Sequence, residues 1–599
     1  MGAKAEKGVR DRFASTERLE LLFVVMEAHL ASAAVQEACV GALENLALNA
    51  EKKWRVKFTS LGGLKRVIAA MEAHVRSADV QIAACGVLKN VAVTASETRE
   101  ILGSAGHVIM ASLDANMSCV EVQEAALAAL LTLLGPRFKF TTGVEDSFAR
   151  AIINQVVASM AAHIGSQAVQ ELGCVVLAKL PEDAFLPMTE FVILGALQSV
   201  YAAMDAHMAS AGVQRHACEV LCCVASSDSV DLIPSGGLER VHRAMEGHPT
   251  SVTLQAASLE LLVYVSDSAF SRAQLASGAL NLRLDLVFAA MDAFPASKDV
   301  QLRGCRVFQM LSQFGGVAVA AGQSNVESCV KRVLAVLRAH SEDGCVQVAV
   351  FDAVCHWGNN ADYRANILSS GCVGLAYRAV ESYHEPDIAV HVSALGLLVV
   401  LVEVQPWDPQ TLEAIASGLD QLSAILLWID ALAVYRACRV LANLVQDAGI
   451  ATRFEAGGGL ENVYAAMEAH VKDPKVQDAA CCLVARLQQH RVVHGLASNA
   501  IPLARGLSGL YNAMQEHIAS ERVQQSAVTI LVGMAASVAG MTRLRQGGRV
   551  AALLRRARAA HPDVALIANI CDRLIHGLNN ADCRCLDLAG TGRKPAALH

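Results

Sequence analysis

The phrase Ala70-Met71-Glu72-Ala73-His74, followed by Val80-Gln81 and an apolar helix, decides the fold of this chain. It returns as Ala466-Met467-Glu468-Ala469-His470 with Val476-Gln477, and looser copies occur about every 44 residues. A unit of this size cannot bury its apolar face alone, so neighbouring copies must stack on one another. The sequence therefore predicts a solenoid rather than a set of separate globular domains.

The histidine of the phrase sets a register in which thirteen copies can be counted. The copies are marked by His29, His74, Asn116, His163, His207, His248, Phe294, His340, His384, Trp428, His470, His517 and His561. Seven positions later, the first twelve copies have Gln36, Gln81, Gln123, Gln170, Gln214, Gln255, Gln301, Gln347, His391, Tyr435, Gln477 and Gln524. The last copy has a shorter loop, which is typical of a terminal repeat that caps an array.

Each copy contains the pattern of two amphipathic helices after a glycine break. Leu64, Val67 and Met71 have the spacing of one helix face, and this helix is expected to end at His74, where the ring can cap free carbonyl groups. A second helix with the same spacing begins near Val80. Glycine pairs that permit a sharp reversal before the first of them are Gly62-Gly63, Gly236-Gly237, Gly458-Gly459 and Gly547-Gly548. A shorter helix before the break completes a unit of three helices.

Composition and charge agree with helices that are packed on both sides. Apolar residues make up 54% of the chain and aromatic residues only 5%, so small side chains must fill the core. The mean hydropathy is +0.37. A formal net charge of −7 gives no general field that would attract nucleic acid or an anionic membrane.

The eighteen cysteines are predicted to be reduced core residues. Five of them lie four positions after the glutamine of the repeat, namely Cys85, Cys174, Cys218, Cys305 and Cys481. Disulfide frameworks belong to short secreted chains, so this pattern indicates a cytoplasmic, possibly nuclear, protein. Near the C-terminus, His576, Cys583 and Cys585 match the spacing of a metal site only weakly. We therefore predict neither metal nor cofactor.

The chain is expected to be one array between two polar ends. Residues 1–18 form a polar N-terminal segment, residues 19–580 form the array, and residues 581–599 form a flexible tail. The most apolar stretch, residues 388–402, is shorter than the roughly 18 apolar residues that a spanning helix needs. It is predicted to be a buried repeat helix, so no membrane insertion is expected.

These units resemble the armadillo repeat over nearly the whole chain. The motifs that carry the resemblance are Gly62-Gly63-Leu64, Val35-Gln36-Glu37 and Ala42-Leu43-Glu44-Asn45-Leu46-Ala47. The Ala-Met-x-Ala-His variant is also similar to the armadillo array of leucine-rich-repeat kinases. The resemblance implies an all-α fold, a right-handed α-solenoid of about thirteen three-helix repeats whose third helices line a concave groove.

The same resemblance implies a set of peptide-binding asparagines. In armadillo proteins an asparagine nine positions after the glutamine grips the backbone of an extended peptide. That residue is present as Asn45 and Asn90, and approximately as Asn443. The tryptophan that nuclear-import receptors place four residues before it is replaced, by Gly41 in the first copy for example. Import of basic signals is therefore not expected.

Two further groups of charged residues are candidates for partner binding. A groove position in the middle of the array holds Glu219, Glu260, Arg306 and Asp352. Packed helices are spaced by about 10 Å, so these residues either form a local acidic surface for a basic segment or are ordinary solvated side chains of mixed sign. The last copies carry Arg543, Arg545, Arg549, Arg555, Arg556 and Arg558. This basic patch fits an acidic protein, a phosphate or RNA, or else is the solvated face of a terminal repeat.

The pattern favours a non-catalytic scaffold or adaptor for proteins. It shows no phosphate-binding glycine loop, no HExxH element, no nucleophile elbow and no paired catalytic carboxylates in a suitable setting. The predicted partner is an extended protein or peptide segment bound along the concave groove. A module that binds RNA or an acidic partner through the C-terminal arginines is the alternative, and an enzyme is the least favoured class.

Overall fold

The structure is a computed structural model that describes residues 16–48, 50, 52–91, 95–134, 145–183, 187–227, 232, 235–267, 282–313, 326–382, 388–403, 409–493, 503–535, 538–546 and 548–580. These residues form 32 helices and no strand. By their internal contacts they divide into two compact units, unit 1 (residues 1–310) and unit 2 (residues 311–599). The predicted all-helical solenoid is confirmed. The expected ends, residues 1–18 and 581–599, lie almost wholly outside the described residues.

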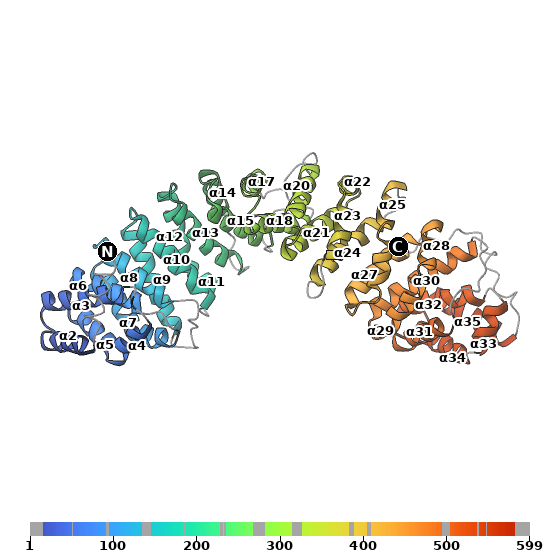
Figure 1. The fold of residues 1–599 in the computed structure, drawn as a ribbon, viewed down its shortest axis with the longest axis horizontal. Coiled ribbons are helices and arrows are strands. Elements are labelled where there is room, and N and C mark those ends of the chain that lie inside the picture. Colours follow the sequence, from blue (N-terminus) through green and yellow to red (C-terminus); the bar gives the residue numbers. More distant parts are fainter. Residues whose placement is uncertain are drawn as a thin grey trace, which may run out of the picture. The chain divides into compact units, whose positions relative to one another are not determined.

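Unit 1 contains seven helix pairs in the order that the repeat predicts (Figure 1). The second helices are α2 (Thr16–Ala28), α5 (Gly63–Ala73), α7 (Ala95–Ala115), α9 (Glu145–Ala162), α12 (Ala196–Ala206), α14 (Gly237–Gly247) and α17 (Leu284–Ala293). The third helices are α3 (Ala33–Ala47), α6 (Ala78–Val91), α8 (Val120–Leu133), α10 (Gln167–Asp183), α13 (Ala211–Ala225), α15 (Val252–Asp267) and α18 (Lys298–Gln313), whose last residues belong to unit 2. Separate first helices are α4 (Lys52–Ser60) and α11 (Met188–Ile193).

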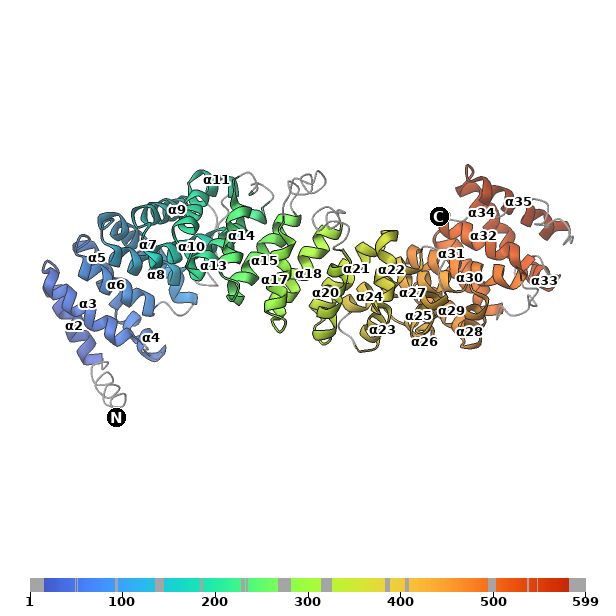
Figure 2. The same ribbon diagram turned by 90° about the horizontal axis from the view of Figure 1, so that it is seen from above.

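Unit 2 contains six more pairs, which Figure 2 shows from above. The second helices are α20 (Val326–Ala339), α23 (Cys372–Ser382), α26 (Leu419–Ile425), α29 (Gly459–Ala469), α31 (Leu503–Glu516) and α34 (Val550–Ala560). The third helices are α21 (Gly344–Gly358), α24 (Ile388–Val402), α27 (Ala431–Leu444), α30 (Pro474–Val493), α32 (Glu521–Ala535) and α35 (Ala565–Asn580). Separate first helices are α22 (Ala361–Ser369), α25 (Pro409–Ala416), α28 (Ala448–Ala456) and α33 (Val538–Gln546).

Glycines make the reversal into the second helix, as the sequence predicts. Gly62, Gly236 and Gly458 have left-handed backbones, with φ of 74°, 75° and 76°, directly before α5, α14 and α29. Only glycine adopts this conformation without steric cost. Arg283 occupies the same place before α17 with φ of 41°, where it pairs with Asp285 and Glu246.

The buried glutamine of the repeat links the second and third helices through hydrogen bonds. In α13, Gln214 donates from Nε2 to the carbonyl oxygens of Met204 at 2.8 Å and His207 at 3.0 Å. These carbonyls belong to the last turn of α12, where no intrahelical donor remains. Eight further glutamines make the same pair of bonds, namely Gln36, Gln81, Gln123, Gln170, Gln255, Gln301, Gln477 and Gln524.

The histidine caps a carbonyl of the preceding repeat rather than one of its own helix. His207 Nε2 lies 2.7 Å from the carbonyl oxygen of Ile164, and His74 Nε2 lies 2.7 Å from that of Leu30. A carbonyl can only accept, so Nε2 carries the proton. Asn116, which replaces the histidine, makes the equivalent bond to Val75 at 2.7 Å. These bonds of the histidine position therefore join successive repeats. His384 lies outside the described residues.

Repeat 10 is shifted by one residue from the sequence-based register. Asp430 is the N-cap of α27 and accepts a hydrogen bond from the backbone N–H of Ala433, as Ser210 does from Val213 in α13. The glutamine position is therefore Val434, and the assignment of Tyr435 and Trp428 to the pattern is wrong by one position. His470 supports the shift, because its ring bonds to the carbonyl of Trp428, one position after the true histidine site.

The apolar stretch at residues 388–402 forms α24, whose side chains are largely buried as predicted. Among the described residues, no single helix is long and apolar enough to cross a membrane. The segments Glu521–Ala535 and Gly540–Gln546, bent by 119°, pass that test together by length and composition alone.

Candidate functional site

The solvent-facing side of the third helices is the candidate site, because successive repeats contribute equivalent positions to it and the predicted partner-binding residues lie on these helices. We call this surface the third-helix face; it comprises the residues two positions before and one, two, five and nine positions after the glutamine site, which share one side of the helix. Within unit 1 the third helices α3, α6, α8, α10 and α13 lie side by side in chain order, and α21, α24, α27, α30 and α32 do so within unit 2 (Figures 1 and 2).

The predicted clamp asparagines of unit 1 lie on this face. Asn45 is exposed and donates from Nδ2 to the carbonyl of Gly41 on its own helix at 3.0 Å. Asn90 is half-buried on α6, one repeat further along. Their side chains can reach a segment that lies along this face.

Asn443 occupies the true clamp position, because it lies nine residues after Val434. Its Oδ1 accepts a bond from Nη1 of Arg486 at 2.8 Å, and its Nδ2 donates to the carbonyl of Arg439 at 3.1 Å. Arg486 stands at the clamp position of the next repeat and also donates to the carbonyl of Ala442 at 2.8 Å. Asn443, which the sequence placed only approximately, is therefore equivalent in position to Asn45 and Asn90.

Glu219 lies in a network of charges on α13. Arg215 Nη1 is 3.0 Å and His216 Nδ1 is 2.8 Å from its carboxylate. Burial raises the pKa of Glu219, but the bond from His216 and the charge of Arg215 outweigh burial and hold the pKa below its usual value. His216 also lies 3.7 Å from Glu171 on α10, so the network joins two repeats.

The other charged candidates do not share one environment. Glu260 on α15 pairs with Arg303 Nε on α18 at 2.5 Å. Arg306 is exposed on α18, and Asp352 is half-buried on α21 in unit 2. Because Glu219 and Glu260 are each paired with an arginine, this part of the third-helix face carries mixed charge.

A cluster of arginines on the third-helix face of unit 2 was missed by the sequence analysis. Arg436 and Arg439 are on α27, Arg486 is on α30 and Arg522 is on α32. Burial lowers the pKa of Arg439, and the charges of Arg522 and Arg486 act in the same direction. Arg486 and Arg522 therefore lie close enough to Arg439 to influence it, and Arg436 and Arg522 both lie near Tyr435.

The signal that would have revealed this cluster was Asp430. Aspartate is a typical N-cap residue, and the N-cap of a third helix lies four positions before the glutamine site. Asp430 therefore identifies Val434 as the glutamine site of α27. Arg439 then lies five positions later, in line with Glu219 and Glu260. The sequence-based register instead placed Val440 there, which is buried.

The six C-terminal arginines do not form one free basic patch. Arg545 donates to the carbonyls of Gly577 at 2.9 Å and Leu578 at 3.2 Å, so it caps α35. Arg558 pairs with Asp572 at 2.7 Å. Arg543 is half-buried on α33. The other three, Arg549, Arg555 and Arg556, are exposed before and along α34.

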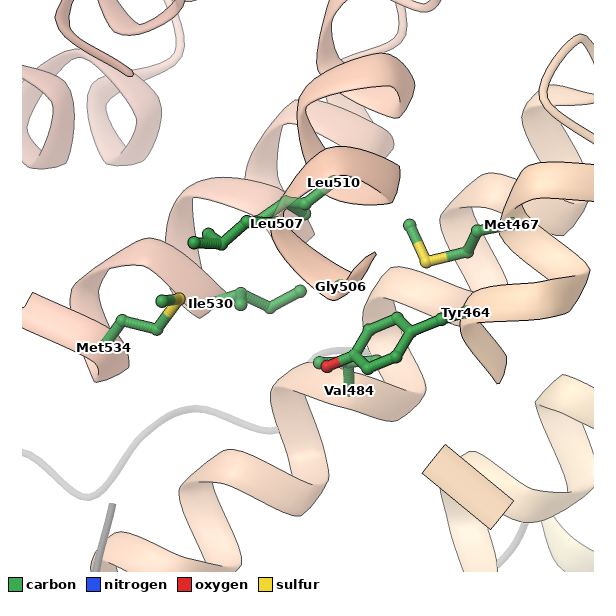
Figure 3. Close-up of a pocket in the computed structure, with 8 residues that line it drawn as sticks. All are labelled: Tyr464, Met467, Val484, Gly506, Leu507, Leu510, Ile530 and Met534. Atoms are coloured by element: carbon green, nitrogen blue, oxygen red, sulfur yellow. The ribbon is translucent and has the colours of Figure 1, made fainter. Parts of the chain in front are cut away.

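Two cavities of the described residues lie between neighbouring helices. One of about 10 Å³ lies among α29, α30, α31 and α32 and is lined by Tyr464, Met467, Val484, Gly506, Leu507, Leu510, Ile530 and Met534 (Figure 3). It holds roughly one water and contains no acid, base or nucleophile pair. The other, about 260 Å³, lies between α20 and α22 and is lined in part by Arg338, Asn366 and Ser369.

Cysteines and metal-binding groups also lack reactive settings in the described part of the chain. Burial raises the pKa of Cys85, Cys174 and Cys218 to about 12, so these thiols stay protonated. Burial likewise raises the pKa of Cys355 to about 11 beside His356. No group of three His, Cys, Asp or Glu side chains there could hold a metal ion. Cys583 and Cys585 lie outside the described residues.

Comparison with known proteins identifies the fold alone. No family model and no curated protein match the sequence. A chain from the structure of the cadherin and beta-catenin interaction matches with a TM-score of 0.58 and 12% identity, covering 84% of this chain and 97% of that one. An engineered protein matches with a TM-score of 0.48 and 17% identity over 78% and 98% of the chains. UNC-45 from Drosophila melanogaster matches with a TM-score of 0.36 and 13% identity over 99% and 80%. The first of these shows that the chain is a helical-repeat solenoid.

Proposed function

We propose that this protein is a non-catalytic scaffold that binds an extended segment of a partner protein along its third-helix face. The observation that carries the proposal is the ordered stacking of third helices, which places polar side chains at equivalent positions in successive repeats. Many modest contacts then add up along a long segment, while the solenoid itself reorganises little. We further propose that the repeats are of the armadillo type and similar to those of leucine-rich-repeat kinases.

The chemistry of the described residues supports binding over turnover. Most side chains of the third-helix face are half-buried or exposed, and the apolar cavity of Figure 3 has room for about one water. An enzyme usually encloses its substrate in a larger pocket with converging polar groups. A scaffold needs only an accessible surface. The protein is proposed to work without a cofactor, in the cytoplasm or the nucleus, where its thiols stay reduced.

The proposed binding residues are drawn from both units. Asn45, Asn90 and Asn443 are at the clamp position, and Glu219, Glu260, Arg306 and Asp352 supply charge at a neighbouring position. A second use, of the exposed Arg549, Arg555 and Arg556 for an acidic partner or RNA, remains the alternative function. The two surfaces belong to different helices of the repeat, so separate variants can distinguish them.

Proximity labelling with the full chain, followed by binding assays on the recovered partners, tests the function. We expect Glu260→Lys to weaken at least one partner about tenfold, because the reversal leaves Arg303 beside a second cation. Glu239→Lys on the second helix α14 is the matched control, since Glu239 is exposed but not on the third-helix face. Equal loss in both variants, or no protein partner at all, would contradict the proposal.

A further inference from the structure

We propose that the third-helix face of α27, α30 and α32 binds an extended acidic segment of a partner protein, with its carboxylates on Arg439, Arg486 and Arg522. This inference rests on the scaffold function proposed above and names the class of segment and the place where it binds. Its basis is a cluster of guanidinium groups from three consecutive third helices in unit 2.

The first step is the charge of the surface. Arg439 pairs with Glu403 and, like Arg522, lies near Asp478; Arg486 lies near Arg439, and Arg436 lies near Tyr435 on the same helix, so four cations accompany two carboxylates. Burial raises the pKa of Asp478 even though Arg522 and Arg439 oppose the shift. The remaining positive charge favours an acidic partner over a basic one.

The second step is the supply of hydrogen-bond donors. Arg486 uses Nη1 for Asn443 and Ala442 and also lies within hydrogen-bonding reach of the Cys482 thiol, but a guanidinium has five N–H groups, so it has further donors. The bond to Oδ1 fixes the amide of Asn443, whose Nδ2 gives one N–H to Arg439 and has a second one left. Asn443 and Arg486 together can therefore hold a backbone carbonyl and a carboxylate.

The third step is the apolar surface beside the arginines. The Arg436 side chain packs against α24, where it donates to the carbonyl of Val392 and lies against Gly396. Val392, Val399 and Val400 are half-buried on the solvent side of that helix. An acidic segment that also carries apolar side chains would fit both parts, whereas a purely charged chain would leave the valines uncovered.

A protein segment fits this surface better than RNA does. Asp478 and Glu403 would repel a continuous phosphate backbone, while a peptide can place its carboxylates selectively. Tyr435 is the one aromatic side chain of the cluster, and its ring is taken by the guanidinium of Arg439, 5.8 Å from the ring centre. Binding of single strands typically uses several aromatic platforms.

Fluorescence anisotropy with the full chain tests this inference. The probes are labelled peptides of repeated Glu-Leu-Glu-Gly and of repeated Lys-Leu-Lys-Gly, and a labelled oligouridylate. We expect the acidic peptide to bind more tightly than the other two and to lose affinity as salt is raised. Arg522→Glu should weaken it about tenfold. Arg522 is exposed and makes no hydrogen bond within the described residues, so this variant keeps the fold.

The controls separate the site from general charge. Arg378→Glu on the second helix α23 makes the same charge reversal at an exposed residue outside the third-helix face and should change the affinity for the acidic peptide less than twofold. Equal weakening by Arg522→Glu and Arg378→Glu, a preference for the basic peptide, or tighter binding of RNA would each overturn the inference. If recovered partners bind the protein but only Glu260→Lys weakens their binding, the scaffold function is supported and the proposed site on α27, α30 and α32 is wrong.

Discussion

At the scale of single residues, the buried glutamine makes hydrogen bonds that its position in the sequence did not reveal. Gln214 is 2% exposed, and its Nε2 donates to the carbonyl of Met204 and to that of His207, which also accepts from the backbone N–H of Ser210. The histidine then joins each repeat to the one before it. The sequence showed that these residues recur, but their bonds depend on how two helices and two repeats meet in space.

The glutamine bond predicts a large effect from one substitution. Gln214→Leu keeps the side-chain volume but removes both bonds and leaves the carbonyl of Met204 without its donor, which should cost about 2 kcal/mol of the free energy of unfolding. Urea unfolding followed by circular dichroism measures this. Gln198→Leu on the exposed side of α12 is the control and should change stability by less than about 0.5 kcal/mol. Similar losses in both variants would show that the Gln214 hydrogen bonds are not a source of stability.

At the scale of helices, the sequence predicted the second and third helices well and the first helices poorly. Second and third helices carry a fixed phrase and a long apolar stripe, so α5 and α29 begin at the expected glycine pairs. First helices are short, and in repeat 3 the pattern gave no warning that α7 would run for 21 residues without a break. The register of α27 failed because Val434 replaces the glutamine, and with it the Arg439 site was lost.

Two glycines of unit 1 should respond in opposite directions to the same change. A Cβ on Gly63 would lie 2.4 Å from the ring of Phe58, which is held by Trp54 at 5.2 Å and Phe23 at 5.8 Å between ring centres. Gly63→Ala should therefore destabilise the fold by about 1–3 kcal/mol. Gly41 lies inside α3 with nothing within 4 Å of such a Cβ, so Gly41→Ala should stabilise by about 0.5–1 kcal/mol. Thermal unfolding of both variants checks the signs, and two shifts of the same sign would contradict this account.

At the scale of the whole molecule, the two compact units predict that stability is not shared evenly along the array. Solenoid repeats contact only their neighbours, so a loss in one region need not reach a distant one. Trp54 is the single tryptophan of unit 1, whereas Trp357, Trp407 and Trp428 all belong to unit 2. In a Trp54→Phe background, tryptophan fluorescence therefore reports on unit 2, while circular dichroism reports on all helices.

This arrangement makes the independence of the units measurable. Adding Gly63→Ala to Trp54→Phe should lower the urea midpoint of part of the circular dichroism signal and leave the fluorescence midpoint in place. The reason is that the clash at Phe58 destabilises unit 1, and the contacts that hold unit 2 together are unchanged. If the fluorescence midpoint falls by the same amount, the array unfolds as one cooperative body, and a partner bound on α27, α30 and α32 would then stabilise α5 as well.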